Sequence, residues 1–249
     1  MDEEVLAGGN ASGTVVRIGD TVRKPWSDAT PSVSRFVNAL RAEGVDAPEP
    51  RGWDDEGRQV LEFVPGRLAI AEPPLTAADL RRVGSMIRGI HDASARYVPE
   101  AGDVWRTAIP APGAELVCHN DLAPWNLVTG DRWVFVDWDA AAPSTRLWDL
   151  AYAAQAFALS DDGRDPERAA DDLAALVDGY GADGVMRRDL PRAMEERTAA
   201  MLALLEGARA TGEEPWALMH ATGHGDHWAK ALRYVREHRA VWARTLGGT

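Results

Sequence analysis

The sequence predicts an α+β fold in which a small β-rich lobe is followed by a larger, mainly helical lobe. Near the start, two short β-branched runs meet at Gly19-Asp20, a pair that favours a tight turn and hence a β-hairpin. After Ser144, apolar residues recur at helical spacing along most of the chain. A buried strand ends at Pro65-Gly66, so we predict an N-terminal lobe of residues 1–66 and a C-terminal lobe of residues 67–249.

Three elements are predicted in the first lobe. The hairpin covers "GTVVRIGDTVRKP", residues 13–25. Residues 31–42, "PSVSRFVNALRA", place apolar side chains at helical spacing, and Pro31 suits the first turn of a helix. The buried strand then covers "RQVLEFVPG", residues 58–66.

The second lobe begins with a helix and a pair of strands. Thr76-Ala-Ala-Asp79 resembles a capping box with Asp in place of the usual Glu or Gln, which predicts a helix from Thr76 to about His91. The segments "AELVCHN" and "RWVFVDW" are predicted strands on either side of a loop, with a hairpin turn at Thr129-Gly130-Asp131. Helices broken by Gly and Pro are expected at about 145–159, 166–180, 189–210 and 226–245.

Composition excludes several classes of protein. The net charge of -12 argues against a nucleic-acid-binding face, since phosphate backbones attract clustered Lys and Arg. Cys118 is the only cysteine, so no intramolecular disulfide can form and a reducing compartment is expected. The start "MDEEVLAGGN" does not resemble a secretory signal, and no run approaches the roughly 20 apolar residues of a membrane span. We therefore expect a cytoplasmic protein without a membrane or nucleic-acid partner.

The loop between the two strands of the second lobe carries the residues best suited to catalysis and metal binding. Asp121 lies in an H-x-D turn, where it can accept a hydrogen bond from an incoming hydroxyl. Asn126 follows it, and Asp137 ends the strand "WVFVD"; both offer oxygen atoms of the kind that magnesium prefers. Such a set suits phosphoryl transfer, where catalysis consists mainly of positioning and charge neutralisation. Ordinary turn residues are the alternative interpretation.

A family resemblance favours the catalytic interpretation. "HNDLAPWNLV" followed by "VFVDWD" resembles the catalytic segment of the aminoglycoside phosphotransferase and choline kinase families, which are relatives of the protein kinases. The helix after that segment resembles "RLWDLAY" of this chain. The first strands of these families resemble "LAGGNASGTVVRIGDTVRKP", and their connection between the lobes resembles "LEFVPG". The resemblance runs from about Leu6 to Phe157 and implies a protein-kinase-like two-lobed fold.

The resemblance also implies a nucleotide site that takes ATP or GTP. Thr21-Val22-Arg23-Lys24 aligns with the kinase strand V-A-I-K, so Lys24 would contact the α- and β-phosphates and Val22 would cover the adenine. Lys24 is one of only two lysines, the other being Lys230. Glu62 and Val64 would offer backbone groups to the nucleotide base.

Within the catalytic segment, the resemblance implies a role for each polar residue. Asp121 would be the catalytic residue, and Asn126 and Asp137 would bind Mg²⁺. His119 is expected to hold the shape of the loop, and Asp149 to brace that loop from the following helix. Asp139, which lies two residues beyond Asp137, is a candidate substrate-side or supporting acid.

Two departures from the kinase pattern stand out. Kinases pair the strand lysine with a glutamate of the next helix, but here no acid occurs before Glu43, at the end of that helix. Three alternatives follow for the acidic partner of Lys24. Glu43 contacts the lysine from the end of the helix, Asp28 takes the place of the helix glutamate, or the lysine has no such partner. The spacing between Asn126 and Asp137 is also shorter than in most protein kinases, which predicts a shorter hairpin with both metal ligands at its base.

The C-terminal helices are expected to form the pocket for the phosphate acceptor. Carboxylates there would suit a polyamine sugar, and aromatic rings would suit a quaternary ammonium group. The candidates are Glu195, Glu196, Glu206, Glu213, Glu214 and Asp226 among the acids, and Trp216 and Trp228 among the aromatic residues. For each acid, simple solvent exposure is the competing interpretation, so the tail does not choose between acceptors.

The segment "HATGHGDHW" offers a competing site. Histidines four residues apart, such as His220 and His224, can chelate zinc on a helix. Gly223 and Gly225 disfavour a rigid helix, however, and no general-base glutamate lies between these histidines. Histidines at a helix end or in the acceptor pocket are the favoured interpretation.

The combined patterns predict a phosphotransferase that moves the γ-phosphate of ATP or GTP to a hydroxyl of a small molecule. An aminoglycoside or other cationic antibiotic is the first expectation for the acceptor. A metabolic acceptor such as choline, a sugar or an amino alcohol is the alternative within the same enzyme class. A nucleotide-binding pseudokinase is the alternative outside it, favoured by the missing helix glutamate and opposed by the intact Asp121, Asn126 and Asp137.

Overall fold

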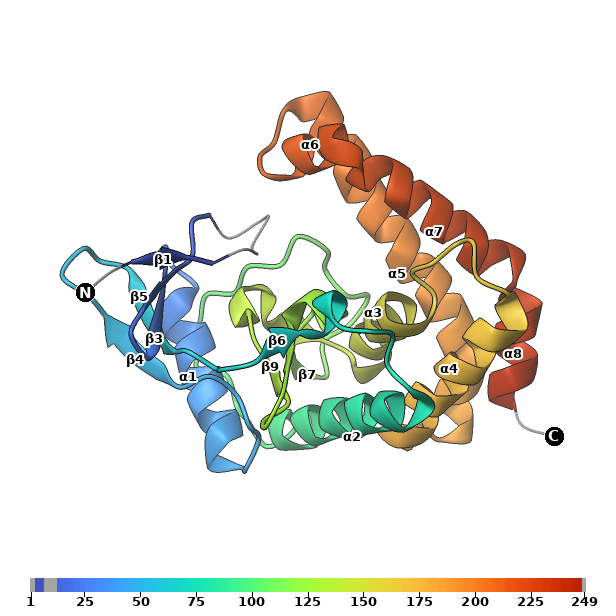
Figure 1. Cartoon of the computed structure of the whole chain (residues 1–249), viewed down its shortest axis with the longest axis horizontal. Coiled ribbons are helices and arrows are strands. Elements are labelled where there is room, and N and C mark those ends of the chain that lie inside the picture. Colours follow the sequence, from blue (N-terminus) through green and yellow to red (C-terminus); the bar gives the residue numbers. More distant parts are fainter. Residues whose placement is uncertain (1–2, 7–12, 248–249) are drawn as a thin grey trace.

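The computed structural model describes residues 3–6 and 13–247 and contains a small β-rich lobe beside a larger helical one (Figure 1). This confirms the predicted α+β, protein-kinase-like fold class. The segment "AGGNAS", residues 7–12, which belongs to the stretch that resembles the first kinase strands, lies outside the described residues.

The strands form three separate sheets; α1 follows β3, α2 follows β6, and α3 to α8 follow the last strand. The strands are β1 (Glu4–Val5), β2 (Val16–Ile18), β3 (Thr21–Lys24), β4 (Pro50–Trp53), β5 (Gln59–Glu62), β6 (Arg67–Leu68), β7 (Leu116–Cys118), β8 (Leu127–Thr129), β9 (Val134–Phe135) and β10 (Ala142–Ser144). The helices are α1 (Thr30–Ala42), α2 (Ala77–Ser94), α3 (Arg146–Ala158), α4 (Pro166–Tyr180), α5 (Gly184–Thr211), α6 (Trp216–Met219), α7 (Gly225–Glu237) and α8 (Arg239–Gly247).

The N-terminal sheet has the strand order β1-β2-β3-β5-β4, and all its neighbouring strands are antiparallel. The predicted hairpin is confirmed as β2 and β3, in which Ile18 pairs with Thr21 across the turn. The predicted helix is confirmed as α1. The edge strand β4 was missed because it contains Pro50 and Gly52, which weaken a strand pattern but are tolerated at a sheet edge.

Two small sheets support the loop that carries Asp121. β7 pairs with β10, and β8 pairs with both β6 and β9. The predicted hairpin is confirmed as β8 and β9, whereas β7 belongs to a different sheet from β9. Gly66, in the connection between β5 and β6, has a φ of 149°, and a Cβ there would collide with the backbone carbonyl of Thr129. We propose this connection as the boundary between the lobes 1–66 and 67–249.

The helices of the C-terminal lobe enclose the main core. The capping box of α2 is confirmed, with the Thr76 side chain accepting from the Asp79 N–H and the Asp79 carboxylate accepting from the Thr76 N–H. Where α2 crosses α4, a Cβ at Gly84 would collide with the backbone of Leu176, so the helices meet in near backbone contact. None of the helices in the described residues is long and apolar enough to cross a membrane.

The last third of the chain departs most from the expectations. The helix predicted at 189–210 begins five residues earlier as α5, with Pro191 inside it. The single helix predicted at 226–245 is wrong: α7 ends at Glu237, and α8 begins after His238. Before α7, the short helix α6 runs into a π-helical turn at His220–His224. The C-terminal end of α5, with α6 and the start of α7, forms an arm that projects from the helical lobe (Figure 1).

Candidate active site

Asp121 and Asn126 face each other across the loop between β7 and β8. The Asn126 side-chain amide donates to the Asp121 carboxylate at 2.7 Å and to the Asp121 carbonyl at 2.9 Å. The Asn126 carbonyl accepts from the Val136 N–H at 2.8 Å, which fixes this loop to the residue before Asp137. The amide hydrogens of Asn126 therefore point at Asp121, and its Oδ1 has no partner among the described residues.

The second carboxylate oxygen of Asp121 accepts a hydrogen bond from the hydroxyl of Tyr152 on α3, at 2.8 Å. Burial raises the pKa of the Asp121 carboxyl, and the hydrogen bond from Tyr152 only partly offsets this. Both oxygens are thus held by a neutral donor, which fixes the orientation of the carboxylate. The sequence pattern did not identify Tyr152, although this residue lies three positions after Asp149 and hence on the same side of α3.

His119 is fully buried and bonds to backbone at both ring nitrogens. Its Nδ1 accepts from the Asp121 N–H at 3.3 Å, and its Nε2 donates to the Val136 carbonyl at 3.1 Å. This pattern requires the neutral ring with its proton on Nε2. The ring also packs against Trp138, with 4.5 Å between centroids.

Asp149 lies behind the loop, at the start of α3, and is buried. One of its oxygens accepts from the Asn120 N–H at 2.8 Å, and the other accepts from the His91 ring at 3.0 Å. His91 on α2 in turn contacts the Tyr180 hydroxyl at 2.9 Å. The described part of the chain contains one group of three potential metal ligands whose ligand atoms all lie within 4.8 Å of one another. The group consists of His91, Cys118 and Asp149. The hydrogen bonds of His91 and Asp149 account for this cluster without an ion.

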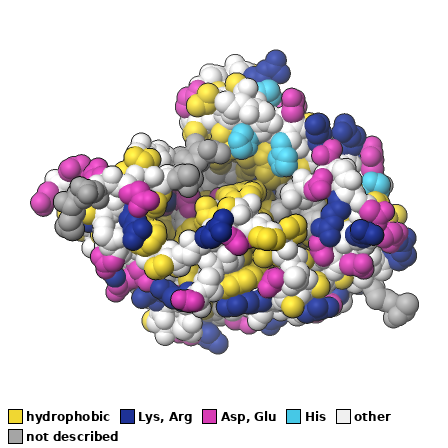
Figure 2. Space-filling model, viewed as in Figure 1, with side chains coloured by type: hydrophobic (Ala, Val, Ile, Leu, Met, Phe, Trp, Pro, Cys, Tyr) yellow, Lys and Arg dark blue, Asp and Glu magenta, His cyan; other side chains and the backbone are white. Residues whose placement is uncertain are grey.

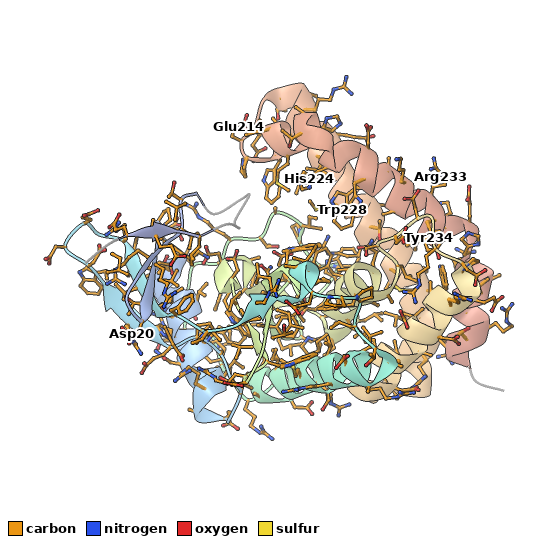
Figure 3. The ribbon with its side chains drawn as sticks, in the orientation of Figure 1. Asp20, Glu214, His224, Trp228, Arg233 and Tyr234 are labelled. Carbon is orange, nitrogen blue, oxygen red and sulfur yellow. The ribbon has the colours of Figure 1, made fainter. Side chains whose placement is uncertain are left out.

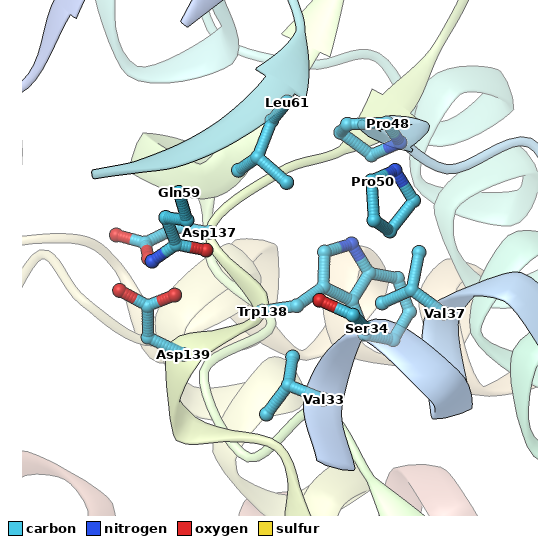
Figure 4. Close-up of a pocket in the computed structure, with 10 residues that line it drawn as sticks. All are labelled: Val33, Ser34, Val37, Pro48, Pro50, Gln59, Leu61, Asp137, Trp138 and Asp139. Carbon is cyan, nitrogen blue, oxygen red and sulfur yellow. The ribbon is translucent and has the colours of Figure 1, made fainter. Parts of the chain in front are cut away.

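Asp137 adopts a left-handed backbone conformation, with φ of 61° and ψ of 64°. Few residues other than glycine tolerate this region, although Asp is among those that do. As a result, Trp138 points toward α1, whereas the carboxylates of Asp137 and Asp139 both lie on the opposite side of the backbone (Figure 4).

Both carboxylates contact Lys24, whose side chain is buried. Its ammonium group lies 2.5 Å from Asp137 Oδ1 and 2.7 Å from Asp139 Oδ2. Burial would lower the pKa of Lys24, but the two carboxylates outweigh it and the pKa is raised. Burial would likewise raise the pKa of Asp137, but the attraction of Lys24 outweighs it and the pKa is lowered.

The acidic partner of Lys24 therefore does not come from helix α1. Glu43 pairs with Arg96 at 3.0 Å, and Asp28 pairs with Arg106 at 2.6 Å, so neither reaches the lysine. Asp139, a candidate substrate-side or supporting acid, lies against Lys24.

The other residues expected at the nucleotide lie along β3 and the connection after β5. Val22 pairs with Leu61 across the β3–β5 ladder. The Glu62 N–H donates to the Glu49 carbonyl at 2.9 Å, and the Glu62 carboxylate pairs with Arg132 at 2.6 Å. The Val64 N–H has no hydrogen-bond partner among the described residues.

Arg197, on α5, is a second buried cation that the sequence did not reveal. Its guanidinium carbon lies 4.3 Å from the ring centroid of Tyr152, and one guanidinium nitrogen donates weakly to the Asn120 carbonyl at 3.4 Å. Its Nη1 is buried without a partner, and it forms no ion pair within the described ranges. Burial lowers the pKa of Arg197. One arginine in an arginine-rich helix carries no distinguishing signal, so only the fold identifies it.

The six candidate acids of the C-terminal helices do not gather around one acceptor site. Glu195 pairs with Arg236 at 2.9 Å and Arg239 at 3.4 Å, and Glu196 lies 3.5 Å from Arg192. The other four, Glu206, Glu213, Glu214 and Asp226, are exposed. The histidines of "HATGHGDHW" are absent from the metal-ligand groups found among the described residues.

Comparison with known proteins finds a family match over the segment that carries Asp121, Asn126 and Asp137. Residues 100–195 match the model of the phosphotransferase enzyme family. The trifolitoxin immunity protein of Rhizobium leguminosarum bv. trifolii is 29% identical over 197 residues, which cover 73% of this chain and 75% of that protein.

Solved structures share the fold along nearly the whole chain. A choline/ethanolamine kinase family protein from Mesorhizobium loti has a TM-score of 0.67 at 16% identity, covering 99% of this chain and 92% of the other. An amicoumacin kinase has a TM-score of 0.68 at 14% identity, with 96% and 88% coverage. A microcompartment-associated aminopropanol kinase has a TM-score of 0.66 at 16% identity, with 97% and 93% coverage.

The resemblance inferred from the sequence is therefore confirmed. Residues 100–195 carry the match to the phosphotransferase enzyme family, and nearly the whole chain shares its fold with the choline/ethanolamine kinase family protein and the amicoumacin kinase.

Proposed function

We propose that this enzyme transfers the γ-phosphate of ATP to a hydroxyl group of an antibiotic or toxin, with Asp121, Asn126, Asp137 and Lys24 as its phosphotransfer centre. The observation that carries the proposal is the convergence of these four side chains from three separate segments. Asn126 lies 2.7 Å from Asp121, and Lys24 lies 2.5 Å from Asp137.

Asp121 is the proposed catalytic residue. Tyr152 and Asn126 each donate to one of its oxygens, so the carboxylate is fixed before the acceptor arrives. An acceptor hydroxyl donates its hydrogen bond to this carboxylate, which aligns the hydroxyl oxygen for attack on the γ-phosphorus. As the new P–O bond forms, the bond from the γ-phosphorus to the bridging oxygen breaks, ADP leaves, and Asp121 receives the hydroxyl proton. His119 and Asp149 hold the backbone on either side of Asp121 and are proposed as supports.

The residues present fit a divalent cation. Asn126 Oδ1 is free of partners among the described residues, and Asp137 is an ionised carboxylate with a lowered pKa. These are hard oxygen donors of the type that Mg²⁺ prefers, so we propose Asn126 and Asp137 as its ligands. When bound, the ion neutralises charge on the phosphate oxygens. One structural neighbour was solved with AMP-PNP and Ca²⁺, which supports a nucleotide and a divalent cation in this fold.

On the nucleotide side, Lys24 is proposed to contact the phosphates. To do so, its ammonium group gives up part of its contact with Asp137 and Asp139. Val22 is proposed to cover the adenine and the unpartnered Val64 N–H to bond it. Glu62 can contribute only its carbonyl, because its N–H is already bonded to Glu49.

The proposal of an antibiotic or toxin as acceptor is supported by the relative named as an immunity protein and by the neighbour named as an amicoumacin kinase. An amino alcohol is the second candidate, supported by the neighbours named as choline/ethanolamine and aminopropanol kinases.

A coupled assay of ATP consumption, with magnesium, would test the proposal over aminoglycosides, macrolides, tuberactinomycin-type peptides, choline and sugars. We expect one acceptor class to stimulate ADP release and to gain one phosphoryl group by mass spectrometry. Lys24→Met should abolish the signal, whereas Lys230→Met, which removes the only other lysine, should not. Nucleotide binding without transfer to any acceptor would indicate a pseudokinase instead.

A further inference from the structure

Tyr152 joins the loop that carries Asp121 to the helices around it. Its hydroxyl donates to Asp121 Oδ1 at 2.8 Å, and only 5% of the residue is exposed. Burial raises the pKa of Tyr152 well above its ordinary value, so the hydroxyl keeps its proton and remains a donor. Hydrogen bonds to an ionised carboxylate are stronger than those between neutral groups. The Tyr152 hydroxyl therefore holds one oxygen of Asp121 in a fixed direction.

The ring of Tyr152 is in turn held by residues from other elements. Trp228 of α7 stacks on it, with 6.2 Å between ring centroids and an interplanar angle of 16°. The guanidinium carbon of Arg197, on α5, lies 4.3 Å from the ring centroid, and Trp125 meets the ring edge-on at 6.5 Å. Stacking and cation–π contacts both depend on how a ring is turned. The place of the hydroxyl on Asp121 therefore depends on α5 and α7.

Trp228 brings the arm into contact with this ring. It lies near the start of α7, on the inner side of the arm toward α3, and is 3% exposed (Figure 3). In the space-filling view, the molecule is hollowed between the arm and the lobes, and hydrophobic side chains gather in the hollow (Figure 2). The arm thus reaches Asp121 through two stacked rings, Trp228 and Tyr152, by contacts within the chain that need no acceptor.

We propose that Tyr152 is a positioning residue for Asp121 and that Trp228 holds Tyr152 in place, so that the arm affects the rate of the chemical step. The inference rests on the proposed function, since it assumes that Asp121 receives the proton of the attacking hydroxyl. A small displacement of this carboxylate costs much of the rate, because attack requires a well-oriented hydroxyl. Loss of the Tyr152 hydroxyl should therefore lower kcat and leave nucleotide binding unchanged.

Hydrolysis of ATP with magnesium tests the proposal with water as the acceptor, so that no organic acceptor contacts the arm. The water oxygen attacks the γ-phosphorus, the bond to the bridging oxygen breaks, ADP and inorganic phosphate leave, and Asp121 receives the proton. Tyr152→Phe keeps the ring and should lower kcat by about 10- to 100-fold at an unchanged nucleotide KM. Trp228→Leu should lower kcat by about 2- to 10-fold, and by nothing further in the Tyr152→Phe background.

A second tyrosine–tryptophan pair provides the matched control. Tyr234 and Trp242 are also buried, with 5.6 Å between ring centroids. The Tyr234 hydroxyl, however, donates to the backbone carbonyl of Arg164, at 3.0 Å, and not to a carboxylate. Tyr234→Phe and Trp242→Leu should therefore leave kcat per folded molecule unchanged.

The kinetic outcomes separate this inference from the proposed function. If Asp121→Asn slows hydrolysis but Tyr152→Phe does not, the inference is wrong and the proposed function stands. Additive losses from Tyr152→Phe and Trp228→Leu would also overturn the inference, because the tryptophan would then act independently of the hydroxyl. If Asp121→Asn hydrolyses ATP as fast as the parent, the proposed function itself is refuted.

Proton NMR on the full-length enzyme, with AMP-PNP and magnesium, tests the same link without turnover. The buried Tyr152 hydroxyl proton should exchange slowly with water and give a resonance that Tyr152→Phe removes and Asp121→Asn displaces. Trp228→Leu should displace or broaden this resonance, and Tyr234→Phe should retain it. The absence of any slowly exchanging hydroxyl resonance that Tyr152→Phe removes would contradict the proposal, as would a resonance that Asp121→Asn leaves in place.

Discussion

Lys24 and Arg197 are both buried cations beside the candidate site, but their surroundings differ. Lys24 lies within 2.7 Å of two carboxylates and has a raised pKa. Arg197 lies over an aromatic ring, has no carboxylate partner among the described residues, and has a lowered pKa. Lys24 is thus held by opposite charge, whereas Arg197 is held by an aromatic ring and a backbone carbonyl. The difference indicates that ionic contacts dominate around Lys24, on the nucleotide side, whereas aromatic contacts dominate around Arg197, on the acceptor side.

The largest expected effect is on the residue between the two sides. Asp121→Asn should lower kcat by about 10²–10⁴-fold, since an amide cannot receive the hydroxyl proton. Nucleotide affinity should barely change, because Asp121 makes no contact with Lys24 or Asp137 through hydrogen bonds. Steady-state kinetics on the acceptor found in the screen provide the measurement. The matched control is Asp131→Asn, on an exposed aspartate of the β8–β9 hairpin; equal rates for both variants would remove Asp121 from the mechanism.

The next largest effect concerns the nucleotide side. Asp137→Ala should abolish the gain in AMP-PNP affinity that magnesium provides, a loss of about 2–5 kcal/mol, because it removes the charged ligand and leaves only neutral Asn126. Calorimetric titration with and without magnesium measures this gain directly. Asp139→Ala should retain most of it, since Asp139 is proposed as a partner of Lys24 and not as a ligand. If Asp137→Ala and the parent gave identical titrations, Asp137 would hold no metal.

The smallest effect compares the two cations themselves through the free energy of unfolding in urea. Lys24→Met leaves Asp137 and Asp139 without their shared partner and should destabilise the protein by about 1–3 kcal/mol. Arg197→Met removes a buried charge that forms no ion pair within the described residues, so its effect should stay within about 1 kcal/mol of zero. A larger loss for Arg197→Met than for Lys24→Met would mean that the contacts of Arg197 outweigh the cost of burying its charge.

Local patterns predicted most of the fold. The Gly19-Asp20 hairpin, α1, the Thr76 cap of α2 and the residues flanking Asp121 all depend on neighbours in the sequence, and each appears where the pattern placed it. The helices after residue 184 were harder to place, because the break at His238 and the π-helical turn before α7 depend on packing between helices.

The site likewise contains residues that the local sequence identified and residues that only the folded chain brings together. Asp121, Asn126 and Asp137 were proposed from one short stretch, and the structure brings them together, although their roles stay predictions. The partner of Lys24 could not be predicted, since Asp139 reaches it only through the left-handed backbone at Asp137. Tyr152 and Arg197 come from separate helices and meet only in the folded chain.

The salt dependence of the two Michaelis constants tests most directly whether the two sides handle charge differently. Raising sodium chloride from 0.01 M to 1 M shortens the Debye length from about 30 Å to about 3 Å. The nucleotide KM, which depends on Lys24 and magnesium, should rise over this range. The acceptor KM should stay constant, because the side chains next to Asp121 on this side, Tyr152 and Trp125, are uncharged. An acceptor KM that rises as steeply as the nucleotide KM, or more steeply, would contradict a neutral acceptor side.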